Sequence, residues 1–327
     1  MFKKLLVPLD RSSLAEQATG QAAAIARASN AAIDLVSVYE PVVLDAMLDE
    51  PLHVAEWDAT HRYLESMAAE LSSGAGVWAT HGLLKGDPVE RICHHARDTG
   101  ADLIVMTSHG RTGLSRAWLG SVADGLIRRA HIPVLVLRPI ENAASRKAAH
   151  SLFKHVLVPL DASAQSAEVL TAAVPLARCS GGRVSLLCVV QPVPLASAAA
   201  GIPLGYIPPA LFDEAATRGL VEAAEHQLAE VAHAVREEHG LSVETHVIVG
   251  DTIAHAILDF ARTHDADLIA MATHGRGVSR LLLGSVADKV LRGCGLPLLA
   301  YRPARAIADA ETIASTTNTR VPTIAPV

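Results

Sequence analysis

Short runs rich in valine, leucine and isoleucine alternate along this chain with alanine-rich stretches typical of helices. The apolar runs predict strands near residues 4–9, 32–38, 77–83, 103–107 and 134–137, and again near 155–160, 183–190, 243–249, 268–272 and 298–301. Helices are expected in the gaps. Because strand–helix–strand alternation requires a parallel sheet with right-handed crossovers and helices on both faces, the pattern indicates an α/β fold.

Local signals place the start of two helices. The first helix is expected over residues 14–28 with Ser12 or Ser13 as its N-cap, because a serine oxygen can accept a hydrogen bond from a first-turn amide. The third helix is expected to begin at Pro88, because proline is tolerated in the first turn of a helix.

The same motifs occur twice, in the same order. Residues 5–10 read Leu-Leu-Val-Pro-Leu-Asp, and residues 156–161 read Val-Leu-Val-Pro-Leu-Asp. Later segments also match: 101–104 with 266–269, 109–111 with 274–276, 120–124 with 284–288, and 138–139 with 302–303. Each copy runs from an opening strand to a closing strand, which indicates two tandem domains of one kind.

The repeat sets the expected domain organisation: a first copy over 1–139, a linker over 140–152, a second copy over 153–303 and a loosely ordered tail over 304–327. The linker is polar and rich in alanine, and the tail lacks the hydrophobic content to pack well. The second copy also carries an insertion after its second strand, whose residues 201–209 are apolar and rich in proline. We favour a contact surface over a lid for this insertion, and both interpretations stay open.

Composition narrows the range of partners. Half of the residues are hydrophobic and only 3% are aromatic, so the cores must be built from small and aliphatic side chains, as buried parallel strands prefer. The formal net charge of -6 offers no field that would hold a nucleic acid or an anionic membrane. No stretch reaches the roughly 18 consecutive apolar residues that a membrane span needs. We therefore expect neither a nucleic acid nor a membrane as a partner.

The four cysteines, Cys93, Cys179, Cys188 and Cys294, are scattered without a Cys-x-x-Cys pair. They indicate neither a disulfide framework nor a zinc site, and they fit a reducing compartment. Near the start of the chain, proline and aspartate at positions 8 and 10 cut the apolar run short of a signal sequence. A cytoplasmic protein is expected.

A glycine-rich loop follows the fourth strand of each copy and leads into a helix. Glycines let a backbone approach a ligand, free N–H groups at a helix start bind anions, and arginine and serine side chains add charge and donors. The positions that offer these groups are Gly110, Arg111, Gly113, Arg116, Gly120 and Ser121 in the first copy, and Gly275, Arg276, Gly277, Arg280, Gly284 and Ser285 in the second. The loop is therefore a candidate phosphate site.

The same glycines have a plain structural explanation. Glycine is common in turns after strands, and a Gly-Ser pair is a common helix start. Two occurrences in register, each with two arginines, favour the binding interpretation. Because the two loops share a common origin, they are not independent observations, and both the turn and the binding explanations stay open.

The Val-Pro-Leu-Asp strand end, the Gly-Asp-Pro before the third helix and the glycine loop together resemble the universal stress protein family, over nearly all of both copies. The resemblance implies, for each copy, a five-stranded parallel sheet of strand order 3-2-1-4-5, a Rossmann-like fold of the adenine nucleotide alpha hydrolase-like kind. It also implies an adenine-nucleotide site, because many members bind ATP through a loop of glycine, two residues, glycine, nine residues, glycine and then Ser or Thr. That strand order puts the switch point of the sheet, where ligands enter, between the first and fourth strands.

Carried over position by position, the resemblance places Asp10 near the ribose and Val38, at the end of the second strand, near the adenine. The phosphates fall to Gly110, Gly120 and Ser121. With the loop positions and their neighbours added to those that the resemblance implies, the candidate nucleotide-binding residues are Asp10, Val38, Gly86, Thr107, His109, Gly110, Arg111, Gly113, Gly120 and Ser121 in the first copy, and Asp161, Val189, Gly250, His274, Gly275, Arg276, Gly284 and Ser285 in the second.

Two departures from the family pattern separate the copies. The first glycine of the family loop is Thr107 in the first copy and Ala272 in the second, so a side chain stands where the backbone needs room. The second loop, from Gly275 to Gly284, is also one residue shorter than the first. The first copy is therefore expected to be the better site.

An enzymatic interpretation has less support. None of the 16 histidines forms a His-Glu-x-x-His motif, and the sequence contains no Gly-x-Ser-x-Gly elbow, Walker lysine or paired carboxylates. His109 and His274 recur beside the loop, where they either orient it or carry a proton. Asp10 and Asp161 either bind magnesium together with phosphate oxygens or cap the following helix. No residue is predicted to be catalytic or to form a metal site of its own. Whether magnesium binds together with the nucleotide stays open.

The leading hypothesis is a tandem universal stress protein that binds ATP or a related adenine nucleotide (ADP or AMP) and regulates a stress response through conformation or partner choice. The rivals are an interaction scaffold without nucleotide and a slow ATP hydrolase. By analogy with the family's dimers, the copies are expected to pack as a pseudo-dimer, and further association into a homodimer stays open.

Overall fold

The protein is described by a computed structural model over residues 1–40, 50–108, 119–138, 152–195, 212–274 and 283–303. In the first copy strands and helices alternate as the sequence pattern predicts. Their order is β1 (Lys4–Pro8), α1 (Gln17–Ser29), β2 (Ala32–Tyr39), α2 (Glu50–Gly74), β3 (Ala79–Lys85), α3 (Pro88–Thr99), β4 (Leu103–Thr107), α4 (Ser121–Arg129) and β5 (Val134–Leu137).

The second copy repeats this order with one additional short helix. Its elements are β6 (His155–Pro159), α6 (Ala164–Ala167), α7 (Leu170–Ser180), β7 (Arg183–Val190), α8 (Glu214–His239), β8 (Ser242–Val249), α9 (Ile253–Thr263), β9 (Leu268–Ala272), α10 (Ser285–Gly293) and β10 (Leu298–Tyr301). Among the helices described, none carries an apolar run that could traverse a lipid bilayer.

The first helix starts three residues later than the sequence predicts, at Gln17. The preceding residues form a turn, in which Asp10 Oδ1 accepts from the Ser12 amide at 3.0 Å and Ser12 Oγ accepts from the Ala15 amide at 3.1 Å. Ser12 therefore caps the turn that leads into α1, and not α1 itself. The start of α3 at Pro88 is confirmed.

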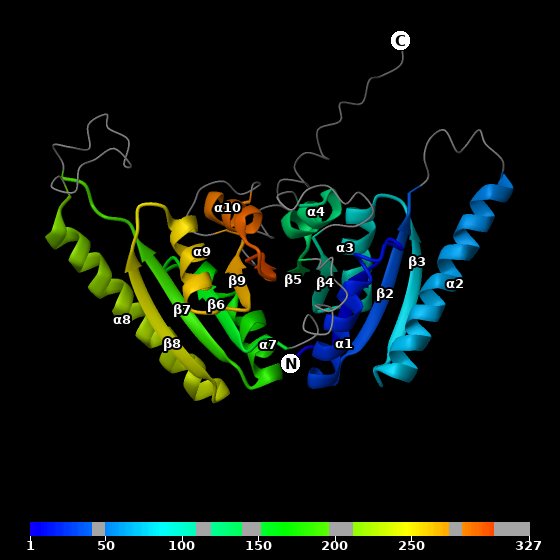
Figure 1. Cartoon of the computed structure of the whole chain (residues 1–327), viewed down its shortest axis with the longest axis horizontal. Helices are drawn as coiled ribbons and strands as arrows, with labels where there is room; N and C mark the ends of the chain where they lie inside the picture. Colours follow the sequence, from blue (N-terminus) through cyan, green and yellow to red (C-terminus); the bar gives the residue numbers. More distant parts are fainter. Residues whose placement is uncertain (41–49, 109–118, 139–151, 196–211, 275–282, 304–327) are drawn as a thin grey trace, which may run out of the picture.

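All ten described strands join one sheet, in the order β3-β2-β1-β4-β5-β10-β9-β6-β7-β8 (Figure 1). Within each copy the strands are parallel and follow the predicted order 3-2-1-4-5, which confirms the fold class. The junction between the copies was not predicted. There β10 pairs antiparallel with β5, so two five-stranded sheets become one.

This junction has the symmetry of a pseudo-dimer. β5 and β10 are corresponding strands of the two copies, in which Leu135 and Leu299 are equivalent residues. These two leucines lie directly opposite each other in the antiparallel ladder, and the flanking residues pair reciprocally. Such reciprocal pairing is the signature of a twofold relation. The pseudo-twofold axis therefore passes through the Leu135–Leu299 pair.

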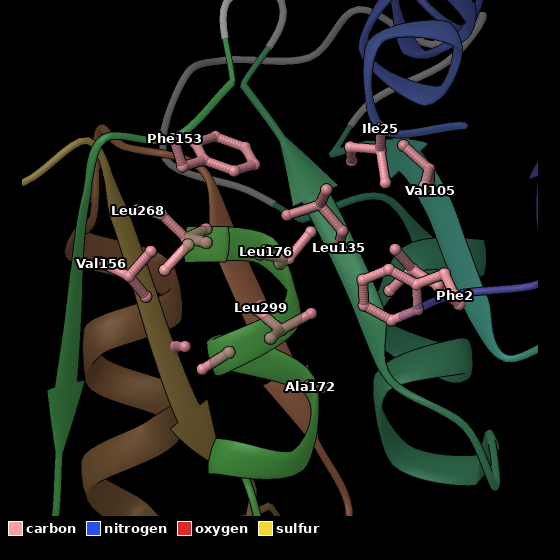
Figure 2. Close-up of a cluster of buried hydrophobic side chains, with 14 of the residues drawn as sticks. Phe2, Ile25, Val105, Leu135, Phe153, Val156, Ala172, Leu176, Leu268 and Leu299 are labelled. Atoms are coloured by element: carbon pink, nitrogen blue, oxygen red, sulfur yellow. The ribbon is translucent and has the colours of Figure 1, made fainter. Parts of the chain in front are cut away.

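Two hydrophobic cores, one on each face of the sheet, cross the junction. One contains buried residues of α1, α2, α7 and α8, and the other contains buried residues of α3, α4, α9 and α10. Figure 2 shows the first core, where Phe2, Phe153, Leu135 and Leu299 lie among side chains of both copies. Because each core is continuous, the two copies share their interior.

Most of the expected linker, the tail over 304–327 and the apolar segment 201–209 lie outside the described residues. The two ends of the insertion that contains this segment are described. Pro194 and Phe212 form an antiparallel bridge, and the Asp213 amide donates to the Val193 carbonyl at 2.7 Å. The insertion therefore leaves and rejoins the second copy at one place.

A buried histidine begins the first strand of the second copy. His155 is 5% exposed, its Nε2 lies 2.8 Å from Ser185 Oγ, and its Nδ1 lies 3.3 Å from Arg183 Nη2. Burial lowers the pKa of His155 below its ordinary value of 6.5, and the Arg183 guanidinium lowers it further. The folded state therefore favours a neutral His155.

We expect His155 to make the fold less stable in mild acid. Below pH 6.5 the unfolded chain takes up a proton here that the folded chain resists, so stability present above that pH is lost as the pH falls. Urea unfolding from about pH 8 to about pH 5 should show a shallower decline for His155→Asn than for the wild type. His226→Asn, at a side chain 78% exposed, should keep the wild-type slope. Equal slopes for wild type and His155→Asn would contradict this expectation.

The shared interior predicts that damage at the junction destabilises both copies together. Leu135 is fully buried, so Leu135→Ala should lower the free energy of unfolding by about 2–5 kcal/mol. Denaturant unfolding should remain a single transition, because each core spans both copies. Leu220→Ala, at a residue 49% exposed, should change stability by no more than about 0.5 kcal/mol. Two separate transitions, with only one shifted by Leu135→Ala, would show that the copies unfold independently.

Candidate functional site

A cavity of about 360 Å³ opens where the carboxyl ends of β1, β2 and β4 meet the starts of α3 and α4. Its position is the switch point between β1 and β4 that the strand order predicts. The lining residues are Pro8, Leu9, Asp10, Ala15, Val36, Val38, Glu40, Pro88, Ile92, Met106, Thr107, Ser108, Gly120, Ser121, Val122 and Ala123. The fold thus brings together Asp10, Val38, Thr107, Gly120 and Ser121 of the residues expected from the sequence.

One end of the cavity is formed by the start of α4. Gly120 is the N-cap residue, with φ −62° and ψ 151°, and its amide donates to the Ser108 carbonyl at 2.8 Å, which ties the helix start to the end of β4. No described side chain caps this helix at Gly120. First-turn amides carry a partial positive charge and lack intrahelical acceptors, so they suit an anion. Thr107, Ser108 and Ser121 add hydroxyl groups at this end.

The opposite end of the cavity is apolar. Alternate residues of β2 point to opposite faces of the sheet, so Val36 and Val38 face the cavity side while Leu35 joins the core on the other face. Pro88 and Ile92, one helical turn apart on α3, complete this wall. An apolar slot of this kind suits the flat ring of a nucleobase.

Asp10 serves both the turn and the cavity. Its Oδ1 accepts from the Ser12 amide, and the residue also lines the cavity beside the carboxyl end of β1. In the strand order β1 lies between β2 and β4, so Asp10 stands between the apolar end and the α4 end. Asp10 therefore holds the turn before α1 and does not cap the helix itself, as one sequence interpretation had it, and this role is compatible with a ligand contact.

Gly86 is not among the residues that line the cavity. Its φ of 129° is one that other residues rarely adopt, and a Cβ there would lie 3.2 Å from Arg91 Cγ. It makes the turn before α3, where the next residue, Asp87, caps the helix by accepting from the Glu90 amide at 2.8 Å. Gly86 therefore supports the α3 wall from outside the cavity.

The second copy keeps the same framework at the start of α10. The Gly284 amide donates to the Thr273 carbonyl at 2.8 Å, as Gly120 does to Ser108. A Cβ at Gly284 would lie 3.1 Å from that carbonyl oxygen, so the close approach favours glycine. His274 Nδ1 lies 2.9 Å from Thr273 Oγ1, and Ser285 is the first residue of α10.

Other parts of the second site differ from the first. Asp161 holds its own turn, because its Oδ1 accepts from the Ser163 amide at 3.0 Å. A Cβ at Gly250 would lie 3.5 Å from Val189 Cγ1, which places these two expected residues side by side. At the position of Ala15, which lines the first cavity, the second copy has the buried Ser166. The second site is thus more polar at this wall.

Several expected site residues lie outside the described residues. They are His109, Gly110, Arg111, Gly113, Gly275 and Arg276. Their roles remain predictions from the sequence.

Sequence reasoning missed Glu40 and Ser108, both of which line the cavity. The period of two along β2 could have found Glu40, because it places residues 36, 38 and 40 on one face. Ser108 follows directly on β4, where a carboxyl-end residue faces the switch point.

Two titratable groups near the site stay protonated at neutral pH. Burial raises the pKa of the Cys93 thiol on α3 to about 11. Burial also raises the pKa of Tyr63 on α2 above its ordinary value of 10, and the neighbouring Glu16 carboxylate, to which the phenol donates at 3.1 Å, raises it further. Neither group offers a ready nucleophile. Within the described part of the chain, no three His, Cys, Asp or Glu side chains are grouped to hold a metal ion.

Known proteins are similar to this chain in sequence and in architecture. The model of the universal stress protein family matches residues 1–138 and 152–302. A universal stress protein of Mycolicibacterium smegmatis is 28% identical over 312 residues, which cover 91% of this chain and 97% of that protein. Another, from Methanocaldococcus jannaschii, is 36% identical over 146 residues, which cover 42% of this chain and 83% of that protein.

A solved structure agrees with the fold. The crystal structure of a universal stress protein from Archaeoglobus fulgidus superposes with a TM-score of 0.66 at 21% identity, covering 91% of this chain and 98% of that one. The family model covers both copies almost from end to end. The chain therefore belongs to the universal stress protein family.

Proposed function

We propose that this protein binds an adenine nucleotide, ATP or a close relative, in the cavity of the first copy, and that it acts in a stress response through conformation or partner choice. The proposal rests on one observation: the cavity has a polar end and an apolar end. The start of α4 offers amides and hydroxyls to phosphates, and the wall of β2 and α3 offers an apolar slot to a base. The volume of about 360 Å³ falls in the range of small-ligand sites.

The Asp10 carboxylate is positioned to contact the ribose of the nucleotide or a bound cation. Its carboxylate lies between the apolar end and the α4 end, where the sugar of a bound nucleotide would sit. Magnesium usually takes one or two protein carboxylates together with phosphate oxygens. We therefore propose Asp10 as the protein's contact to the ribose, and to magnesium if the ion enters with the triphosphate.

The second copy is proposed as the weaker site. It retains the glycine and serine at the start of α10, but it carries Ala272 in place of Thr107 and Ser166 in place of Ala15. Its glycine loop is also one residue shorter. Occupancy of the first copy before the second is the expected order.

Binding is tested by calorimetry and thermal unfolding with ATP. Gly120→Val places a branched side chain at the start of α4, so it should weaken ATP binding at least about tenfold, and Ser121→Ala should weaken it by a smaller factor. At a hundredfold excess over the dissociation constant, ATP should stabilise the wild type by about 2.7 kcal/mol. Thermal unfolding without ligand establishes that each variant folds.

The matched control is Gly295→Val, at an exposed glycine whose added Cβ would meet open space. It should bind ATP as the wild type does. If the wild type gives neither heat nor a thermal shift with millimolar ATP, the nucleotide proposal fails and the interaction scaffold becomes the better explanation.

A further inference from the structure

An ion pair joins the two helices that begin at the candidate sites. Arg128 of α4 binds Asp124 of its own helix, with Nε at 2.8 Å and Nη2 at 3.0 Å from the carboxylate oxygens. The same Nη2 lies 3.8 Å from Asp288 Oδ1 of α10, in the other copy. Asp288 is also bound by Arg292 of its own helix, at 3.0 Å. These four residues, the junction network, lie where Figure 1 shows α4 and α10 as neighbours.

Arg128 is shared between two carboxylates in equivalent positions. Asp124 and Asp288 are corresponding residues of the two copies, each in the first turn of its helix. Hydrogen bonds to Asp124 raise the pKa of the Arg128 guanidinium above its ordinary value, and the charges of both carboxylates raise it further. The Arg128 and Asp288 side chains are only 29% and 32% exposed, so solvent screens their attraction less than that of fully exposed ions. The guanidinium is therefore a counter-ion to both helices.

The junction network lies one helical turn from each candidate phosphate position. The Asp124 amide donates to the Gly120 carbonyl at 2.9 Å, and the Asp288 amide donates to the Gly284 carbonyl at 2.8 Å. The amides of the two glycines are in turn bonded to the chain that follows β4 and β9. A continuous series of contacts thus extends from the first cavity, across the pseudo-twofold axis, to the second site.

Charge at one helix start changes how well the other is neutralised. A carboxylate in the first turn repels an anion at the same helix start, unless a cation neutralises the carboxylate. A negative charge at the start of α10 attracts Arg128 toward Asp288, so Asp124 loses part of its counter-ion. The start of α4 then binds phosphate less well. A charge at the start of α4 has the same effect on α10, as linkage between two binding sites requires.

We propose that Arg128 couples the two candidate sites, so that an anion at the start of one helix weakens anion binding at the start of the other. The inference rests on the proposed nucleotide site of the first copy. Ion pairs that are partly exposed contribute modestly, so the coupling should amount to a factor of about two to five. Coupling of this sign favours molecules in which one site is occupied.

The test places a fixed charge at the second site and measures ATP binding at the first. Ser285→Asp puts a carboxylate on the first residue of α10, and Ser285→Asn is its neutral match. By calorimetry at low ionic strength, ATP should bind the first copy about two- to fivefold more weakly in Ser285→Asp than in Ser285→Asn. In an Arg128→Gln background this difference should fall below about 1.5-fold. Arg128→Lys, which keeps the charge, should retain most of the difference.

Asp288→Asn interrupts the junction network from the other copy, so it should remove the difference as well, and thermal unfolding without ligand establishes that each variant folds. Equal ATP affinities in Ser285→Asp and Ser285→Asn would refute the coupling and leave the nucleotide site intact. A difference that persists in both Arg128→Gln and Asp288→Asn would show that the charges act without Arg128. If the wild type binds no ATP, the coupling and the nucleotide proposal fail together.

Discussion

Each copy ends in a strand whose outer edge has no partner within its own copy: β5 in the first and β10 in the second. An open edge of this kind leaves a row of backbone groups unpaired and is a template for uncontrolled association. The antiparallel pairing of these two strands satisfies both edges at once. Because the strands are equivalent, their pairing also imposes the pseudo-twofold relation. It joins each apolar face of one half to the corresponding face of the other. The shared cores follow from this one contact.

The candidate site follows from the order of strands within each copy. The reversal of connection between β1 and β4 leaves their carboxyl ends uncovered by a crossover helix, so a cavity forms there. The bond from Gly120 to Ser108 fixes the start of α4 at the edge of that cavity. The alternation of β2 then sends aliphatic side chains into the cavity on one face and into the core on the other. In Figure 1 corresponding elements of the two copies lie on opposite sides of the junction, with α2 at one end and α8 at the other.

Most structural features that depend on neighbouring residues were predicted correctly from the sequence. The strands and the start of α3 were predicted from apolar periodicity and a first-turn proline, which are readable without tertiary context, and the strand order was implied by the family resemblance. The start of α1 was misplaced, because Asp10 and Ser12 use their oxygens to form a turn that competes with the first helical turn. The β5–β10 pairing was missed, because it joins strands far apart in the chain and no local pattern reports it. Glu40 was missed because the resemblance implied only Val38 on this strand, although the period of two places both residues on one face.

The continuity of the interior has a consequence for how the two halves can diverge. A duplicated domain that folded alone could decay and be lost once its pocket stopped working. Here the second half supplies partner strands and core side chains to the first, so evolutionary selection for a folded molecule preserves its scaffold whatever its pocket retains. Its loops and pocket walls can therefore change without loss of the fold. The second copy has Ser166, Gln191 and Ala272 at the positions of Ala15, Glu40 and Thr107, which line the first cavity.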